Sequence, residues 1–337
     1  MMPDKNLAKS LVRKQVKEDI HTAKLLANDG DYLEASFRIA KSLNVLGNLG
    51  DKALLKEAKA LSVAYNKEAE KLLTTHEIIP DIDPKIIDGL EDYVVQLTKS
   101  SVLKKNLERM TASRLLVPRY DEAVKNAKKI VPLTAQLVTH ITYGDNGYLK
   151  SFDNFSSDWL FEHYNIQLNL SMSMINMAFS RLYRNNQFDT KPLMDVISGR
   201  GMYGLDQLLR IRTILDHRFS GDYYSAICLL VPLLDKTFMS LSGVLGIDTY
   251  TFGNKLTSTR GKTLSSPMLN SKECQKVWGK DFCIMLDMFL FNEDGYKYRH
   301  RVAHGELALP EYSYTYFNLI FYFLIKISFM VKATKKK

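Results

Sequence analysis

Apolar residues recur at three- and four-residue spacings along most of the chain, with basic and acidic residues between them. In residues 5–75, such positions are Leu7, Leu11, Val16, Ile20, Leu25 and Leu26. This spacing places apolar side chains on one face of a helix. Gly30-Asp31 fits a helix end followed by an N-cap, and Gly50-Asp51 repeats the pattern 20 residues later. Because tetratricopeptide-type arrays repeat about every 34 residues, we predict helical hairpins, repeat-like but not a repeat array.

The same spacing continues to the end of the chain. It predicts helices over 85–111, 120–141, 159–184, 206–217, 222–245, 277–291 and 312–332. Residues 79–84 are a turn-rich break, 185–204 are rich in Gly and Asn, and 248–271 form a long polar loop. Pro232 lies inside a predicted helix, which it should kink. We therefore predict an all-α fold, with a helical scaffold or regulatory region at 1–200 and a helical bundle at 205–337.

Composition agrees with this fold class. The 337 residues are 46% hydrophobic and 25% charged, with 9 Pro and 17 Gly, as in an ordinary globular protein of about two domains. The net charge of +9 suits a polyanionic partner such as nucleic acid, and equally a solvated lysine-rich surface. The excess is spread along the chain, and the only dense run is Lys335–Lys337.

The cysteines and the apolar runs indicate in which cellular compartment the protein works. Cys228, Cys274 and Cys283 form neither a disulfide framework nor a zinc-binding spacing, which favours a reducing cytoplasm. The N-terminus has no signal-peptide pattern. Residues 316–331 are strongly apolar but shorter than the roughly 20 residues that cross a bilayer, and they contain Asn318 and Lys326. We expect a buried core or dimer-interface helix there and no membrane association.

The segment with the most candidate catalytic side chains is Arg299-His300-Arg301-Val302-Ala303-His304-Gly305. An arginine presents a rigid fork of donors that suits a phosphate, and a histidine can move protons near neutral pH. Together they suffice for cutting RNA without a metal. The chain contains neither a Walker-type phosphate loop nor a dinucleotide-binding glycine motif.

Arg299, His300 and His304 match the R-[N/D/H]-x-x-x-H signature of the HEPN superfamily of helical ribonuclease domains. With Gly305, the segment resembles a subgroup whose motif reads R-N-x-x-x-H-G, except that His300 stands in place of Asn. The resemblance covers about residues 205–337. It implies a HEPN-like helical bundle that works as a homodimer, in which each protomer supplies one Arg-His pair to a shared cleft.

In a regular helix, Arg299 and His304 lie about 140° apart and do not share a face. Gly295 and Gly305 favour about two turns of helix with both ends free. In the expected mechanism a ribose 2′-OH attacks the adjacent phosphodiester. His304 is the general base or acid, Arg299 binds the phosphate, and His300 positions the substrate or the catalytic groups. For RNA binding we expect Arg301, Lys297, Arg260 and Lys262 to contribute.

Other interpretations of these residues stay open. His300 and His304 stand at i and i+4, which suits two metal ligands on one helix face, although only Glu306 and Glu311 are near as further ligands. Arg299, Arg301 and His304 can also simply satisfy carbonyls and carboxylates.

The leading prediction is a metal-independent endoribonuclease without a cofactor, serving as a toxin or as an effector of phage defence or stress response. A regulatory protein partner would control it. The alternative is a non-catalytic module that binds RNA, a nucleotide or a protein.

Overall fold

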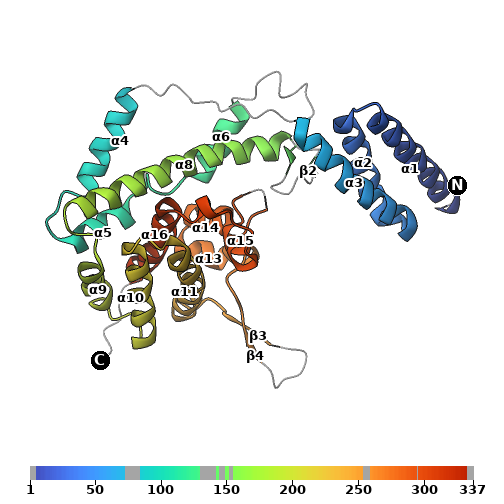
Figure 1. Cartoon of the computed structure of the whole chain (residues 1–337). Coiled ribbons are helices and arrows are strands. Elements are labelled where there is room, and N and C mark those ends of the chain that lie inside the picture. Colours follow the sequence, from blue (N-terminus) through green and yellow to red (C-terminus); the bar gives the residue numbers. More distant parts are fainter. Residues whose placement is uncertain are drawn as a thin grey trace. The chain divides into compact units, whose positions relative to one another are not determined.

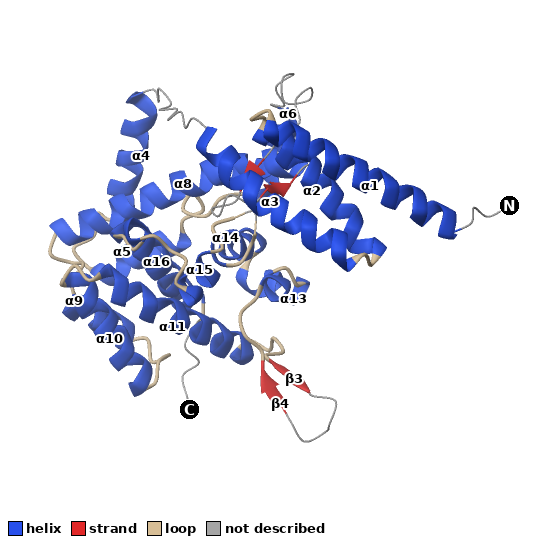
Figure 2. Cartoon of the chain, turned by 45° about the vertical axis from the view of Figure 1, so that its right-hand side comes forward, coloured by secondary structure: helices blue, strands red, loops and turns tan. Residues whose placement is uncertain are grey.

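A computed structural model describes residues 5–72, 84–129, 142–143, 149–151, 155–252, 259–293 and 295–331. Helices dominate these residues, which confirms the predicted all-α fold (Figure 1). The strands are short and form two two-stranded hairpins, as Figure 2 shows in red. The chain divides into two compact units. The first comprises Met1–Pro80 and Val131–Phe155, and the second Asp81–Ile130 and Ser156–Lys337.

The first unit is built on three successive helices, α1 (Lys5–Asn28), α2 (Tyr32–Leu49) and α3 (Lys52–Leu72). The turns between them are short because each ends one helix with a glycine and starts the next with an aspartate. The Asp31 carboxylate accepts a hydrogen bond from the Glu34 amide at 3.1 Å, and Asp51 accepts one from Leu54 at 3.2 Å. The predicted hairpins are therefore confirmed.

Helix α2 packs against both α1 and α3. The small core of the unit uses many alanines, so the helices approach closely. Its buried members are Val16, Ile20, Ala23, Ala27, Ala35, Ile39, Leu46 and Ala58. The strands β1 (Thr142–Tyr143) and β2 (Leu149–Ser151) pair antiparallel in the same unit.

The second unit holds the remaining elements. In chain order they are α4 (Pro84–Leu97), α5 (Leu103–Ala112), α6 (Tyr120–Lys129), α8 (Phe155–Arg184), α9 (Thr190–Ser198), α10 (Leu205–Phe219), α11 (Tyr223–Val244), β3 (Tyr250–Phe252), β4 (Thr259–Gly261), α12 (Ser266–Leu269), α13 (Lys272–Trp278), α14 (Lys280–Leu290), α15 (Tyr298–His304), the 3-10 turn η1 (Leu309–Glu311) and α16 (Tyr314–Met330). The β3–β4 hairpin extends away from the helices (Figures 1 and 2).

Helix α16 lies at the centre of the second unit. Every side chain from Phe317 to Ser328 is buried, so the apolar run near the C-terminus is a core helix, as expected. Helix α11 packs on α16 and on α10. By length and composition α11 is apolar enough to cross a membrane, with half of its most apolar window buried. Core helices of soluble proteins share these features.

The compact units do not follow the division expected from the sequence. Residues on both sides of the expected boundary at 200–205 belong to the second unit, where α9 packs on α10 and α5 packs on α16. The stretch 185–204 contains a helix, α9, of its own. The predicted C-terminal bundle at 205–337 is thus part of a larger unit that also includes α4, α5, α6 and α8.

Four predicted elements differ in detail. The helix expected over 85–111 is two helices, α4 and α5, with residues 98–102 between them. The helix expected over 277–291 is interrupted at Gly279, whose φ of +87° ends α13 and starts α14. The loop expected over 248–271 contains the β3–β4 hairpin and α12, while residues 253–258 lie outside the described part. Helix α6 is described as far as Lys129, and the rest of the helix expected over 120–141 lies outside the described part.

Candidate functional site

The Arg-His segment forms the seven-residue helix α15. It ends as predicted at Gly305, which adopts the left-handed conformation with φ of +67°. Its first residue, Tyr298, is fully buried against the Phe289 ring, 4.9 Å between centroids, and donates a hydrogen bond to the Glu311 carbonyl at 3.0 Å. Burial raises the pKa of Tyr298, so its hydroxyl stays neutral. The helix is therefore anchored firmly at its start.

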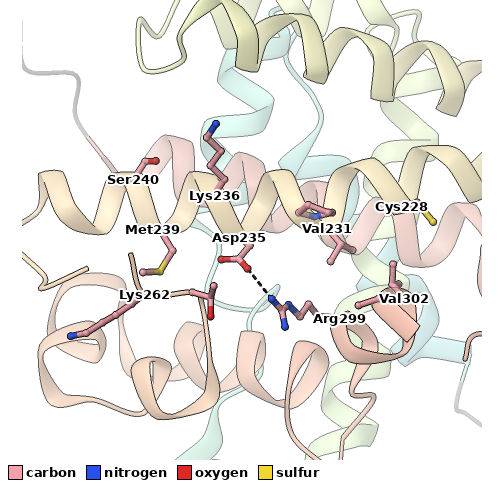
Figure 3. A pocket seen from close by; sticks show the side chains of 12 residues that line it. Cys228, Val231, Asp235, Lys236, Met239, Ser240, Lys262, Arg299 and Val302 are labelled. Carbon is pink, nitrogen blue, oxygen red and sulfur yellow. Dashed lines mark hydrogen bonds and ion pairs between the residues drawn. The ribbon is translucent and has the colours of Figure 1, made fainter. Parts of the chain in front are cut away.

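A pocket of about 570 Å³ lies between α11 and α15 (Figure 3). We call it the Arg299 pocket. Helix α15 lines it with Arg299, Val302 and Ala303, which share one helix face at positions i, i+3 and i+4. Helix α11 and the segment after β4 supply the other walls, with Cys228, Val231, Pro232, Asp235, Lys236, Met239, Ser240, Lys262 and Thr263.

Asp235 fixes the position of Arg299 in this pocket. A terminal guanidinium nitrogen of Arg299 lies 3.3 Å from the Asp235 carboxylate, drawn as the dashed line in Figure 3. The other oxygen of Asp235 accepts a hydrogen bond from the Leu264 amide at 3.0 Å. The Arg299 side chain is still 37% exposed, against 18% for Asp235. The guanidinium is thus oriented from one side and open to the pocket on the other.

The charges around the pocket are mainly positive. Lys262 lines it and lies 3.0 Å from Asp248, an exposed carboxylate outside the lining. Lys236 extends from the side of α11 opposite to Asp235 in Figure 3. The lining therefore contains three basic residues, Arg299, Lys236 and Lys262, and one acidic residue, Asp235. A pocket of this charge favours an anionic ligand.

The His300 and His304 rings contact each other outside the lining of this pocket, tilted by 43°. Their ring centroids are 4.1 Å apart, and neither residue belongs to the lining. His304 is exposed and His300 is half-buried. Since α15 is a regular helix through His304, the divergence expected of positions i and i+5 is present. Within one chain, Arg299 and His304 do not converge on a common point.

The expected RNA-binding residues have different surroundings. Arg301 forms a two-pronged ion pair with Glu311 at 2.7 and 2.6 Å and is largely buried, which suits a structural role. Lys297 starts α15 in the left-handed conformation, 3.5 Å from Glu293. Arg260 lies on β4 opposite Thr251, and its side chain is outside the described part. Of these four, Lys262 alone is seen to line the Arg299 pocket.

The described residues give the His300/His304 pair no third metal ligand. In the part of the chain that the structure describes, no group of three His, Cys, Asp or Glu side chains is placed to hold a metal ion. Glu311, one of the two carboxylates considered from the sequence, is occupied by Arg301 and by the Ala308 amide at 2.9 Å.

Sequence reasoning missed the contribution of α11. Asp235 and Lys236 are the only charged residues in its otherwise uncharged sequence, Tyr223–Val244. Charged residues inside so apolar a helix are costly unless they have partners, and that signal could have identified them. Cys228, at the edge of the pocket, was considered only for disulfides and zinc. Burial raises its pKa, and a hydrogen bond with Tyr312 acts in the opposite direction.

Comparisons of the chain with protein families, with curated proteins and with solved structures found no match. The functional assignment therefore depends on the residues and geometry of α15 and the Arg299 pocket.

Proposed function

We propose that this protein is a metal-independent endoribonuclease of HEPN type. The observation that supports it is that α15 carries two kinds of side chain suited to RNA cleavage, on two of its faces. One face carries Arg299 into a pocket with basic walls, and the next face carries the accessible His300/His304 pair. An arginine that can bind a phosphate and a histidine that can transfer a proton thus lie within one short, well-anchored helix.

The divergence of Arg299 and His304 favours a site built from two copies of the chain. In a homodimer whose two-fold axis passes next to α15, the His304 of one copy faces the Arg299 of the other across one RNA phosphate. His304 removes the proton of the ribose 2′-OH, whose oxygen attacks the adjacent phosphorus. The bond to the 5′ oxygen breaks and that oxygen takes up a proton, leaving a 2′,3′-cyclic phosphate and a 5′-OH.

Each of the other residues has a subordinate part in this proposal. Arg299, oriented by Asp235, neutralises the charge that develops on the phosphoryl oxygens. His300, whose ring is tilted against that of His304, holds the His304 ring in place. Lys262 and Lys236 attract neighbouring phosphates. A toxin or effector role in phage defence or stress response, controlled by a regulatory partner, is part of the same proposal.

The test is cleavage of labelled total RNA by the purified protein, with and without EDTA, beside His304→Ala and Arg299→Ala. We expect EDTA-resistant cleavage that leaves cyclic-phosphate ends and falls about 10²- to 10⁴-fold in His304→Ala. Arg212→Ala, on the exposed face of α10, is the control for a lost surface charge. DNA of matching sequence should stay intact because it lacks the 2′-OH.

Cleavage that EDTA abolishes would contradict the proposal and direct attention to a metal at His300 and His304. Cleavage that survives both alanine variants would place the activity elsewhere or in a contaminant.

A second function, a non-catalytic module that binds RNA or a nucleotide, is favoured by one specific observation. The basic pocket contains Arg299 and Lys262 but neither histidine. For such a module, fluorescence anisotropy with labelled RNA would show salt-dependent binding that Arg299→Ala weakens and His304→Ala leaves unchanged, with no cleavage by any variant.

A further inference from the structure

A buried lysine in the core helix α16 takes no part in the proposed reaction. Lys326 is only 8% exposed. Its ammonium donates a hydrogen bond to the Thr111 carbonyl at 2.5 Å, in the last turn of α5, and lies 5.4 Å from the centroid of the Phe282 ring. No carboxylate pairs with it among the described residues. A buried cation without an anionic partner is costly.

Lys326 lines a second pocket, of about 370 Å³, which we call the Lys326 pocket. Its walls are the segment after α5, the start of α6 and the start of α14, all in the second compact unit. Arg114, Arg119 and Lys280 add three further basic side chains, against two acidic ones, Asp121 and Asp281.

Most of these charges are already paired. Lys280 lies 2.6 Å from Asp121, and Arg119 pairs with Glu122 outside the lining. Asp281 accepts a hydrogen bond from the Tyr120 amide at 3.1 Å. Lys326 and the exposed Arg114 remain as the two cations of the pocket without a carboxylate partner in the described part of the chain.

We propose that the Lys326 pocket binds a phosphate monoester, with Lys326 as the buried point charge and Arg114 as the fork that closes over the phosphate from the rim. A phosphate monoester carries close to two negative charges above pH 7, which matches the two unpaired cations. An arginine and a lysine together suit its oxygens, the first by paired donors and the second by charge.

The protonation of Lys326 is compatible with this ligand. Burial lowers its pKa to about 8, so the amine is still mostly charged at pH 7. A bound dianion would stabilise the charged form further. The phosphate could belong to a small sugar phosphate or to the 5′ end of an RNA strand, which present the same group.

The experiment is isothermal titration calorimetry of the full chain at pH 7.0. The probes are ribose 5-phosphate and a 5′-phosphorylated tetranucleotide, with ribose and the unphosphorylated tetranucleotide as controls. We expect the phosphorylated probes to bind, and Arg114→Gln and Lys326→Met to weaken binding about tenfold each. Arg212→Gln, which removes an exposed arginine of α10 outside both pockets, should leave this affinity unchanged. Binding of the sugar phosphate alone would identify a metabolite site. Binding of both phosphorylated probes would identify a site that recognises the 5′ end of a strand.

Equal affinity in the wild type, Arg114→Gln and Lys326→Met would overturn the proposal, as would no binding of either probe by the wild type. Lys326 would then serve only to cap the carbonyls at the end of α5. A loss confined to a further variant, Arg299→Gln, would place the ligand in the Arg299 pocket and equally overturn it. If Lys326→Met does not fold, the exposed Arg114→Gln variant still decides the question.

Discussion

At the scale of single residues, the structure separates side chains that the sequence presents as one cluster. Arg299, Arg301 and His304 are close in sequence, yet Arg299 pairs with Asp235, Arg301 pairs with Glu311, and His304 contacts His300. The helical repeat of α15 directs them to different faces. Each basic residue therefore has its own partner, and their roles can be tested separately by substitution.

Lys326 gives a prediction about pH. Its pKa is about 8 in the folded protein against 10.5 ordinarily. Between pH 8 and 10.5 the Lys326 amine is mostly protonated in the unfolded chain and mostly neutral in the folded protein. Folding therefore releases a proton and should become more favourable as pH rises through this window. We expect the stability of the wild type relative to Lys326→Met to increase by up to about 1.4 kcal/mol per pH unit, measured by urea unfolding at pH 8 and pH 10.

The comparison with Lys326→Met cancels the other groups that titrate in that range, such as lysines and tyrosines shared by both proteins. A difference that stays constant from pH 8 to pH 10 would mean that the amine has an ordinary pKa in the folded state. Arg114, Arg119, Asp121, Lys280 and Asp281 are the other charged residues that line the same pocket, and both proteins share them.

At the scale of secondary structure, Gly279 decides that α13 and α14 are two helices. Its φ of +87° and ψ of 134° are rarely adopted by residues with a side chain, while a Cβ at this position would meet no atom within 4 Å. The break allows both Trp278 and Phe282 to be buried.

We expect Gly279→Ala to lower the free energy of unfolding by about 1–3 kcal/mol, because the alanine must adopt a strained backbone conformation. The matched control is Gly89→Ala in the interior of α4, where the added Cβ also meets nothing within 4 Å. That change should be neutral or stabilising by up to about 1 kcal/mol. Urea unfolding of the two variants makes the comparison. Equal losses would show that added bulk, not backbone strain, matters at both positions.

The sequence predicted the helices well because their signals are local. Apolar spacing and the Gly-Asp turns located α1 to α3, and the motif helix ended at Gly305 as expected. The Gly279 break was missed since apolar spacing continues across it. The pairing of Arg299 with Asp235 joins residues 64 positions apart, so no local pattern contains it.

At the scale of the whole molecule, domain boundaries were the hardest feature to predict. A Gly- and Asn-rich stretch at 185–204 resembles a linker, yet the second unit continues through it. Compactness depends on contacts between distant segments, such as Lys326 with Thr111, and composition does not reveal those. Whether the Arg-His site spans two copies of the chain also belongs to this scale.

If each site combines Arg299 of one copy with His304 of the other, two inactive variants should complement each other. We expect an equimolar mixture of Arg299→Ala and His304→Ala, allowed to exchange subunits, to recover about a quarter of the wild-type cleavage rate. Half of the dimers would be mixed, and each would hold one intact site of two. A mixture as inactive as its components would contradict a shared site. Mixing Arg299→Ala with itself at the same total concentration is the control.

The placement of the three cysteines gives the Arg299 pocket a built-in reporter position. Cys274 and Cys283 are completely buried, whereas Cys228 is half-buried at the pocket edge. A thiol-directed fluorophore or spin label should therefore attach at Cys228 without any engineered substitution. Because burial raises the pKa of that thiol, labelling should be slow at neutral pH and faster in mild alkali. The signal of the attached label would then follow ligand entry directly, independent of any catalytic turnover.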